Sequence, residues 1–246
     1  MGLQKFKVSD PIATIILPVY NEENDILDTL SSLAAQVLNY PTEIIVVNNN
    51  STDNTQHLLD LCQVNNIFVK AQGVTHARNN ALNIAKGMYI LSVDSDTFYP
   101  PFWADAFIEA LQKNGVSCAY AKYSFLPLDN SNVKISLGIF EYFSQLKYIS
   151  RKLKGRPYLN VYGFNSGFVK EAALAVGGYD LSSKVWEDGR LANTLMKVGK
   201  LKLVTDPRAF VYTSSRRIQL DGGLWAGFGQ RLRKEINRLF LFKKPK

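Results

Sequence analysis

Nearly continuous apolar runs alternate with segments of helical periodicity in the first half of the chain. The runs extend from Ile12 to Val19, from Glu43 to Val47 and from Tyr89 to Val93. Strands that are apolar on both sides are typical of a parallel sheet covered by helices on both faces. The pattern therefore predicts an α/β fold with a mostly parallel sheet flanked by helices.

The connecting segments carry helix-end signals. Asn24 and Ser51 are residue types that can cap the first two helices, at the point where apolar residues begin to recur every three or four positions. A third helix is predicted from about Thr75 to Lys86, with Gly87 as its C-terminal stop. A fourth is predicted from Phe102 to Lys113.

Polar residues follow each apolar run. Tyr20 to Glu23 follow the first strand, Asn48 to Asp53 the second, and Asp94-Ser95-Asp96 the third. In open α/β sheets, ligands bind outside the carboxyl ends of the strands, so these clusters are expected to share one crevice. Two carboxylates spaced i and i+2 on an extended segment point the same way and suit Mg²⁺ or Mn²⁺.

Several different short motifs follow one another through most of the chain. They are Pro18 to Glu22, Asn49 to Thr55, Ala77 to Ala81, Val93 to Thr97, Asn165 to Gly167, Val176 to Asp180 and Trp186 to Asp188. Their order and spacing resemble the family 2 glycosyltransferases, inverting enzymes with the nucleotide-sugar-binding GT-A fold. The resemblance runs from about Ile12 to about Leu203.

The resemblance implies a role for each matching acidic residue. Asp188 matches the general base, and Glu187 is expected to orient the acceptor or the base. This pair opens a predicted helix from Glu187 to Val198. Asp96 is expected to bind a divalent metal directly, whereas Asp94 contacts the donor ribose and reaches the metal through water.

Further residues are predicted to contact the two substrates. The donor-binding candidates are Pro18, Tyr20, Asn21, Glu22, Asn49, Arg78, Asp94, Ser95, Arg216 and Arg217, and the acceptor candidates are Asn165 and Trp186. Arg216 and Arg217 are included because guanidinium groups grip phosphates through two parallel hydrogen bonds. Asn49 stands where relatives often carry an aspartate that reads the nucleotide base. An amide both donates and accepts hydrogen bonds, so the choice among uracil, thymine and guanine stays open.

The C-terminal part of the chain departs from the family pattern. No histidine follows His76, although relatives often place a histidine metal ligand there. Gln230 to Arg233 echo the motif of processive family members, but Lys234 stands in place of its tryptophan. Addition of a single sugar is therefore favoured over processive synthesis.

Charge divides the chain into two parts. Residues 1–120 hold 6 Lys and Arg against 12 Asp and Glu, whereas residues 121–246 hold 23 against 9. The predicted organisation is a GT-A domain over 1–222, with a nucleotide-sugar-binding half (1–120) and an acceptor and catalytic half (121–222). A basic amphipathic C-terminal helix over 223–246 follows.

The basic half is expected to face an acidic partner. Candidates are the donor diphosphate, an anionic membrane surface and a phosphorylated acceptor lipid. Basic, aromatic-rich stretches at 126–156 and 224–246 indicate peripheral membrane contact or an acceptor groove. No nucleic-acid-binding signature accompanies the charge, so no nucleic-acid partner is expected.

The lack of targeting signals and the two isolated cysteines predict a cytoplasmic protein, which can also attach peripherally to the inner face of the membrane. The first ten residues lack an apolar core, and no run of about eighteen apolar residues occurs. Cys62 and Cys118 fit neither a metal-binding spacing nor a disulfide scaffold.

The predicted function is metal-dependent, inverting transfer of one sugar from a nucleotide-sugar to a hydroxyl of a lipid-linked or surface-polysaccharide precursor. The alternative is a non-catalytic nucleotide-sugar or membrane-binding protein of the same fold. Nucleotidyltransferases and dinucleotide oxidoreductases are disfavoured, because a glycine-rich phosphate loop is missing after the first strand.

Overall fold

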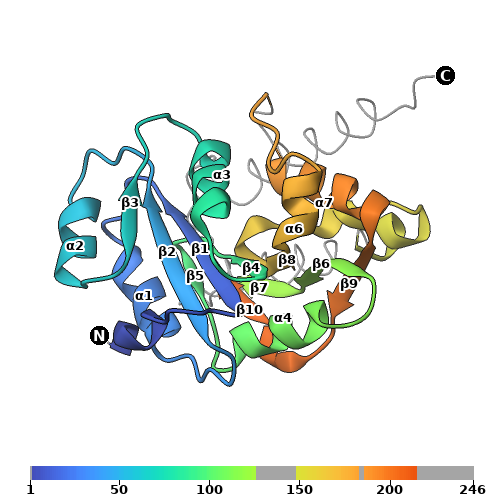
Figure 1. Ribbon diagram of the computed structural model, residues 1–246, viewed down its shortest axis with the longest axis horizontal. Helices are drawn as coiled ribbons and strands as arrows, with labels where there is room; N and C mark the ends of the chain where they lie inside the picture. The colour runs from blue at the N-terminus through green and yellow to red at the C-terminus, as the bar shows by residue number, and fades with distance from the viewer. Residues whose placement is uncertain (1, 126–147, 183–185, 215–246) are drawn as a thin grey trace, which may run out of the picture.

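A seven-stranded sheet forms the centre of the molecule in the computed structural model, which describes residues 2–125, 148–182 and 186–214 (Figure 1). The strand order is β3-β2-β1-β4-β8-β6-β9. The strands are β1 (Ala13–Val19), β2 (Thr42–Asn48), β3 (Asn66–Phe68), β4 (Tyr89–Ser92), β6 (Val116–Ala121), β8 (Ser166–Val169) and β9 (Lys200–Val204). All neighbours in this sheet pair in parallel except β8, which is antiparallel to both β4 and β6. The predicted α/β fold with a mostly parallel sheet is confirmed.

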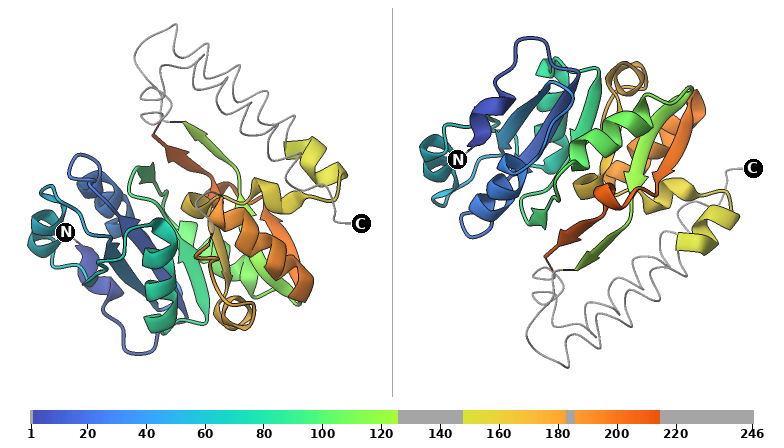
Figure 2. Two further views of the ribbon diagram at one scale, coloured as in Figure 1. Left: turned by 90° about the horizontal axis from the view of Figure 1, so that it is seen from above. Right: turned by 90° about the horizontal axis from the view of Figure 1, so that it is seen from below.

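A small second sheet lies beside the first, with the strand order β5-β10-β7. Its strands are β5 (Thr97–Phe98), β7 (Tyr123–Phe125) and β10 (Val211–Thr213). In both views of Figure 2, β7 and β10 run side by side away from the central sheet, in agreement with their parallel pairing.

Helices cover both faces of the central sheet. The α-helices with printed bounds are α1 (Ile26–Ala34), α2 (Thr55–Leu61), α3 (Val74–Ile84), α4 (Trp103–Leu111), α6 (Lys170–Ala175) and α7 (Glu187–Val198). Residues 148–153 form the end of a further helix. Short 3₁₀ segments occur at η1 (Gly2–Phe6), η2 (Pro157–Asn160), η3 (Gly163–Asn165) and η4 (Pro207–Ala209).

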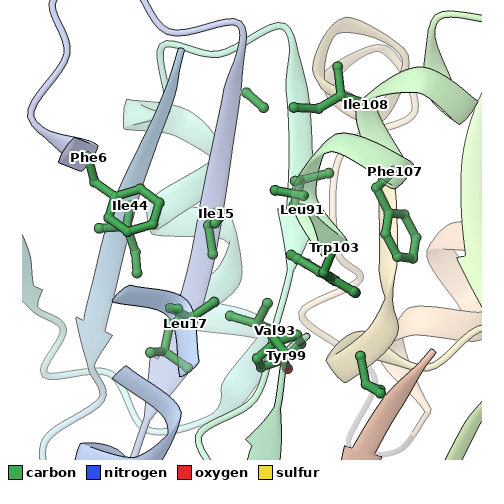
Figure 3. Close-up of a cluster of buried hydrophobic side chains, with 14 of the residues drawn as sticks. Phe6, Ile15, Leu17, Ile44, Leu91, Val93, Tyr99, Trp103, Phe107 and Ile108 are labelled. Carbon is green, nitrogen blue, oxygen red and sulfur yellow. The ribbon is translucent and has the colours of Figure 1, made fainter. Parts of the chain in front are cut away.

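The core divides into two layers because successive strand residues point to opposite faces. Ile15 and Leu17 of β1 belong to the layer that contains residues of α1 and α4, whereas Ile16 between them belongs to the layer that contains residues of α3 and α7. Figure 3 shows the first layer, in which Trp103 and Phe107 of α4 lie beside strand residues such as Leu91. Burying one such side chain stabilises the fold by about 1.5–3 kcal/mol relative to leaving it exposed.

The helix-start predictions at Asn24 and Ser51 were wrong by one and three residues. The N-cap residues are Asp25 for α1 and Asn54 for α2, and neither accepts a capping hydrogen bond through its side chain. The reason is that the two preceding loops bind each other: the Glu22 N–H donates to Thr55 Oγ1, and the Asn54 N–H donates to Glu23 Oε2. These contacts satisfy backbone groups before either helix begins.

The predicted stop at Gly87 was also wrong. Helix α3 ends at Ile84 because Ala85 has an extended backbone with ψ 136°. Gly87 is required for another reason: a Cβ there would lie 2.4 Å from the Ala13 carbonyl carbon, so only glycine allows this approach to β1.

Several predictions fall on residues outside the described ranges. They concern the basic helix at 223–246, Arg216 and Arg217, and residues 126–147 of the aromatic-rich stretch. Across 2–125, 148–182 and 186–214, every helix is too short or too polar to span a bilayer.

Candidate active site

A cavity of about 400 Å³ opens at the carboxyl ends of β1, β2 and β4. Four segments of the first half and two segments of the second half surround it. Its lining residues are Pro18, Val19, Tyr20, Glu22, Asn49, Gln72, Gly73, Val74, Arg78, Asp94, Ser95, Tyr162, Gly163, Phe164, Glu187 and Asp188. Seven of the predicted donor-binding residues and both predicted catalytic acids are therefore brought together.

Arg78 lies at the centre of the acidic residues in this cavity. It projects from α3, is only 2% exposed, and pairs with three carboxylates. Its Nη2 is 2.9 Å from Asp94 Oδ1, and its Nη1 is 2.9 Å from Glu187 Oε1 and also bonds Asp188 Oδ1. Three carboxylates around one guanidinium leave a local charge of about −2 when all are ionised.

Asp188 is held from two sides. Arg78 bonds Oδ1, and the Gly163 N–H donates to Oδ2 at 2.8 Å. Burial raises the pKa of Asp188 to about 7; Arg78 opposes this shift, while Glu187 and Asp94 add to it. A carboxylate with a pKa near neutrality is suited to general-base catalysis.

The position of Asp188 follows from the start of α7. Trp186 adopts a left-handed backbone (φ 63°) and turns the chain, so that Glu187 and Asp188 occupy the first turn of the helix. The positive end of the helix dipole favours carboxylates there. The predicted helix from Glu187 to Val198 is confirmed residue for residue.

Glycine is the only residue type that fits at position 163. A Cβ on this residue would lie 2.1 Å from Nη2 and 2.5 Å from Cζ of Arg78. The guanidinium cannot easily move aside, because three carboxylates hold it. The close approach therefore fixes the distance between the 162–164 segment and the acidic cluster.

We expect Gly163→Ala to lower the catalytic activity of this site at least tenfold, because the added methyl group displaces either Arg78 or the N–H that binds Asp188. Steady-state kinetics would measure the loss. Gly2→Ala is the matched control, since Gly2 lies on the surface and a Cβ there would be 3.5 Å from the Ala34 carbonyl oxygen, an ordinary contact. Unchanged kinetics in Gly163→Ala would show that Arg78 tolerates displacement.

Tyr99 links the two walls of the cavity. The Asp94 N–H donates to Tyr99 Oη at 2.9 Å, and the Tyr99 hydroxyl donates to the Phe164 carbonyl at 2.9 Å. Burial raises the pKa of Tyr99 well above its usual value, which keeps the hydroxyl protonated as a donor. The sequence reasoning did not find Tyr99, although it lies five residues after Asp94.

The side-chain amide of Asn49 is hydrogen-bonded to the neighbouring loop. Its Nδ2 donates to the Val69 and Ala71 carbonyls at 3.1 and 2.6 Å, and its Oδ1 accepts from the Gly73 N–H at 2.8 Å. An aspartate could not make the first two bonds, because a carboxylate only accepts. The amide therefore fixes residues 69–73 at the cavity rim, a role that the sequence did not indicate.

Three other predicted residues have structural roles beside the cavity. Asn21 does not line it; its Oδ1 accepts from the Thr52 N–H at 2.8 Å and joins the first two loops. Asn165 is 1% exposed and binds the Trp103 indole N–H and the Lys122 and Ala209 carbonyls. Asn165 is not among the lining residues, and its predicted contact with the acceptor stays a prediction. Trp186 packs against Tyr158, with ring centroids 6.0 Å apart, at the start of α7.

The chemistry of Asp94 and Asp96 fits a divalent cation. Asp94 and Ser95 line the cavity, and the Asp96 carbonyl accepts the Ser214 N–H, which ties this turn to β10. No group of three potential acidic, histidine or cysteine ligands occurs within the described parts of the chain. Magnesium sites commonly use one or two carboxylates and leave other positions to substrate phosphates, so the pair is sufficient.

Solved structures identify the fold. A mannosyltransferase from Pyrobaculum calidifontis, in complex with GDP-Man and Mn²⁺, has a TM-score of 0.60 and 19% identity, covering 92% of this chain and 65% of its own. TarS from S. aureus, residues 1–349 in complex with UDP-GlcNAc, has a TM-score of 0.58 and 20% identity, covering 82% of this chain and 58% of its own. The fold is the GT-A fold of glycosyltransferases.

Sequence comparison gives the family. The model of glycosyl transferase family 2 matches residues 14–176, and the chain belongs to this family. A UDP-Glc:α-D-GlcNAc-diphosphoundecaprenol β-1,3-glucosyltransferase of Escherichia coli is 30% identical over 126 residues, which are 48% of each protein. The chain thus spans about half the length of this relative.

Proposed function

We propose that this protein transfers one sugar from a nucleotide-sugar to a hydroxyl group, with inversion at the anomeric carbon. The observation that carries the proposal is the position of Asp188: a half-buried carboxylate, 15% exposed and with a pKa near 7, shares one cavity with Asp94. Family membership supports the class of reaction.

Asp188 is assigned as the general base. Its carboxylate takes the proton of the acceptor hydroxyl while that oxygen forms a bond to the anomeric carbon. The bond from this carbon to the donor diphosphate breaks, and its electron pair leaves with the diphosphate. A single displacement of this kind inverts the configuration, and a positioned base contributes roughly 10²–10⁴-fold to its rate.

Arg78 and Glu187 position the base. Arg78 holds Asp188 and Asp94 at a fixed separation, and Glu187 shares the same Nη1. Tyr20, Pro18, Glu22 and Ser95 are assigned to donor contact from their places in the cavity wall.

Asp94 and Asp96 are the residues that would hold Mg²⁺ or Mn²⁺. Such an ion supplies positive charge that stabilises the departing diphosphate. The presence of Mn²⁺ in the Pyrobaculum calidifontis complex supports this assignment.

The acceptor is assigned to the glycan of a lipid-linked or surface-polysaccharide precursor. The Escherichia coli relative is named for such a substrate, a sugar on diphosphoundecaprenol. Contact with the inner face of an anionic membrane fits exposed Ile149 and Leu153, one helical turn apart, beside exposed Lys152 and Lys154.

Thermal-shift measurements with UDP-, GDP- and dTDP-sugars, each with and without Mn²⁺, test the donor site. We expect one nucleotide to raise the apparent Tm only when metal is present, because binding to the native state stabilises it. Slow hydrolysis of the same donor, lost in Asp96→Ala, would separate an enzyme from a binding protein. Stabilisation without hydrolysis would favour the non-catalytic alternative.

The rate of transfer is expected to rise with pH up to about 7. Burial raises the pKa of Asp188 to about 7, and a base must be ionised to accept a proton. The protonated, inactive form therefore dominates below this pH. A profile of kcat/KM from about pH 5 to about pH 9 measures this rise. An aspartate with an ordinary pKa would instead give a constant kcat/KM from about pH 5 upward.

A further inference from the structure

An aromatic cluster borders the candidate base. Tyr162 and Phe164 both line the cavity and stand on either side of Gly163, whose N–H binds Asp188 at 2.8 Å. Both side chains are half-buried. The rings therefore lie within one residue of the backbone group that holds the base.

The cluster is fixed from several directions. The Tyr162 and Phe164 rings stack on each other, with centroids 5.6 Å apart and an interplanar angle of 24°. Tyr123 meets them edge-on at 5.4 and 4.8 Å. Arg151 Nη1 donates to the Tyr162 hydroxyl at 3.3 Å, and Tyr99 binds the Phe164 carbonyl. The two aromatic residues that line the cavity are thus held in place from several sides, and their side chains consist mainly of apolar atoms.

The charge on the Asp188 side of this cluster is negative, whereas Arg151 lies at the Tyr162 hydroxyl. Asp94, Glu187 and Asp188 share the single guanidinium of Arg78. An anionic group that approached Asp188 would be repelled by this arrangement. A neutral molecule with an apolar C–H face and hydroxyl groups satisfies both features: the C–H face packs on the rings, and a hydroxyl reaches the carboxylate.

We propose that Tyr162 and Phe164 form a stacking subsite for a neutral pyranose, and that this sugar carries the attacking hydroxyl. The inference rests on the proposed function and narrows its glycan acceptor to one that places a neutral pyranose, and not a charged group, beside Asp188. The phosphate of a lipid carrier or a polyol phosphate then lies away from Asp188.

Saturation-transfer NMR on the whole protein, with UDP and Mg²⁺ present, tests the subsite. The probes are methyl β-D-glucopyranoside, methyl β-D-N-acetylglucosaminide and glycerol 3-phosphate. In one experiment the aromatic protons of the protein are irradiated, and in the other its methyl protons. We expect the ring C–H protons of a pyranoside to receive more saturation in the first experiment. Glycerol 3-phosphate should receive little. This comparison uses the unmodified protein and needs no variant to fold.

Two leucine variants provide the second arm. Tyr162→Leu and Phe164→Leu should each weaken pyranoside binding about tenfold, because the stacking face is lost. Tyr162→Phe, which keeps the ring, should retain binding. Tyr212→Leu is the matched control, since Tyr212 is an exposed aromatic residue of β10 that does not line the cavity.

The possible results are distinct. Stronger transfer to glycerol 3-phosphate, transfer to no pyranoside, or leucine variants that bind as the parent does would each overturn the subsite. Donor hydrolysis, measured in parallel, reports on the proposed function instead. If the parent contacts a pyranoside and the two leucine variants lose this contact while they still hydrolyse the donor, the subsite is confirmed. Absence of donor hydrolysis in the parent and in every variant would contradict the proposed function.

Discussion

Asp188→Asn should lower kcat for sugar transfer by about 10²–10⁴-fold while leaving donor binding within about twofold. The amide has nearly the shape of the carboxylate but cannot accept the acceptor proton. Transfer kinetics measure the first effect, and donor titration by thermal shift measures the second. A parallel loss of donor affinity would place Asp188 in donor binding instead.

Asp180→Asn is the matched control for this substitution. Asp180 is an exposed aspartate that pairs with Arg190 at 3.2 Å, outside the cavity. Because surface ion pairs contribute little, its kinetics and stability should change only slightly.

The pH dependence of stability gives a second signature of Asp188. Its pKa is raised in the folded state, so the group favours folding below the pKa of the unfolded chain and loses this contribution as pH rises through about 7. The Tm of Asp188→Asn minus that of the parent should therefore increase from about pH 5 to about pH 8. A constant difference would contradict the raised pKa.

Arg78→Met should reduce the free energy of unfolding by about 3–5 kcal/mol at about pH 8. The substitution keeps much of the side-chain volume but leaves Asp94, Glu187 and Asp188 without their shared cation. The loss should be smaller near pH 5, because the carboxylates can then take up protons. Urea denaturation at both pH values measures the difference.

Arg208→Met makes the comparison strict. Arg208 also pairs with two carboxylates, Glu109 and Asp206, each at 2.7 Å, but its side chain is 35% exposed. Solvent screens these pairs, so this variant should lose less than about 1 kcal/mol. Equal losses in the two variants would show that burial does not determine the importance of Arg78.

The strands and helices that the sequence predicted well are those with strong periodicity. The run from Ile12 to Val19 became Ala13–Val19, and the helix from Glu187 to Val198 was confirmed at both ends. The antiparallel direction of β8 could not be predicted, because four residues of mixed character carry no signal of direction.

The site was predictable where side chains carry the chemistry. Arg78, Asp94 and Asp188 were found as residues and the structure brings them together, but their shared ion cluster was not predicted. Gly163 and Tyr99 were not predicted, because Gly163 acts through its backbone N–H and Tyr99 through a buried hydroxyl. The closely spaced aromatic residues around Gly163, just before Asn165, were the one available signal.

The reversed direction of β8 has a consequence for how members of this fold can diverge. Parallel strands present the residues that follow them at the cavity, whereas β8 presents the residues that precede it, including Gly163 and Phe164. Insertions and deletions at 154–156, between the helix that ends at residue 153 and η2, can therefore reshape the region next to Asp188 without entering any strand of the described residues. The turn at 154–156 is a natural point for exchanging substrate preference by segment grafting.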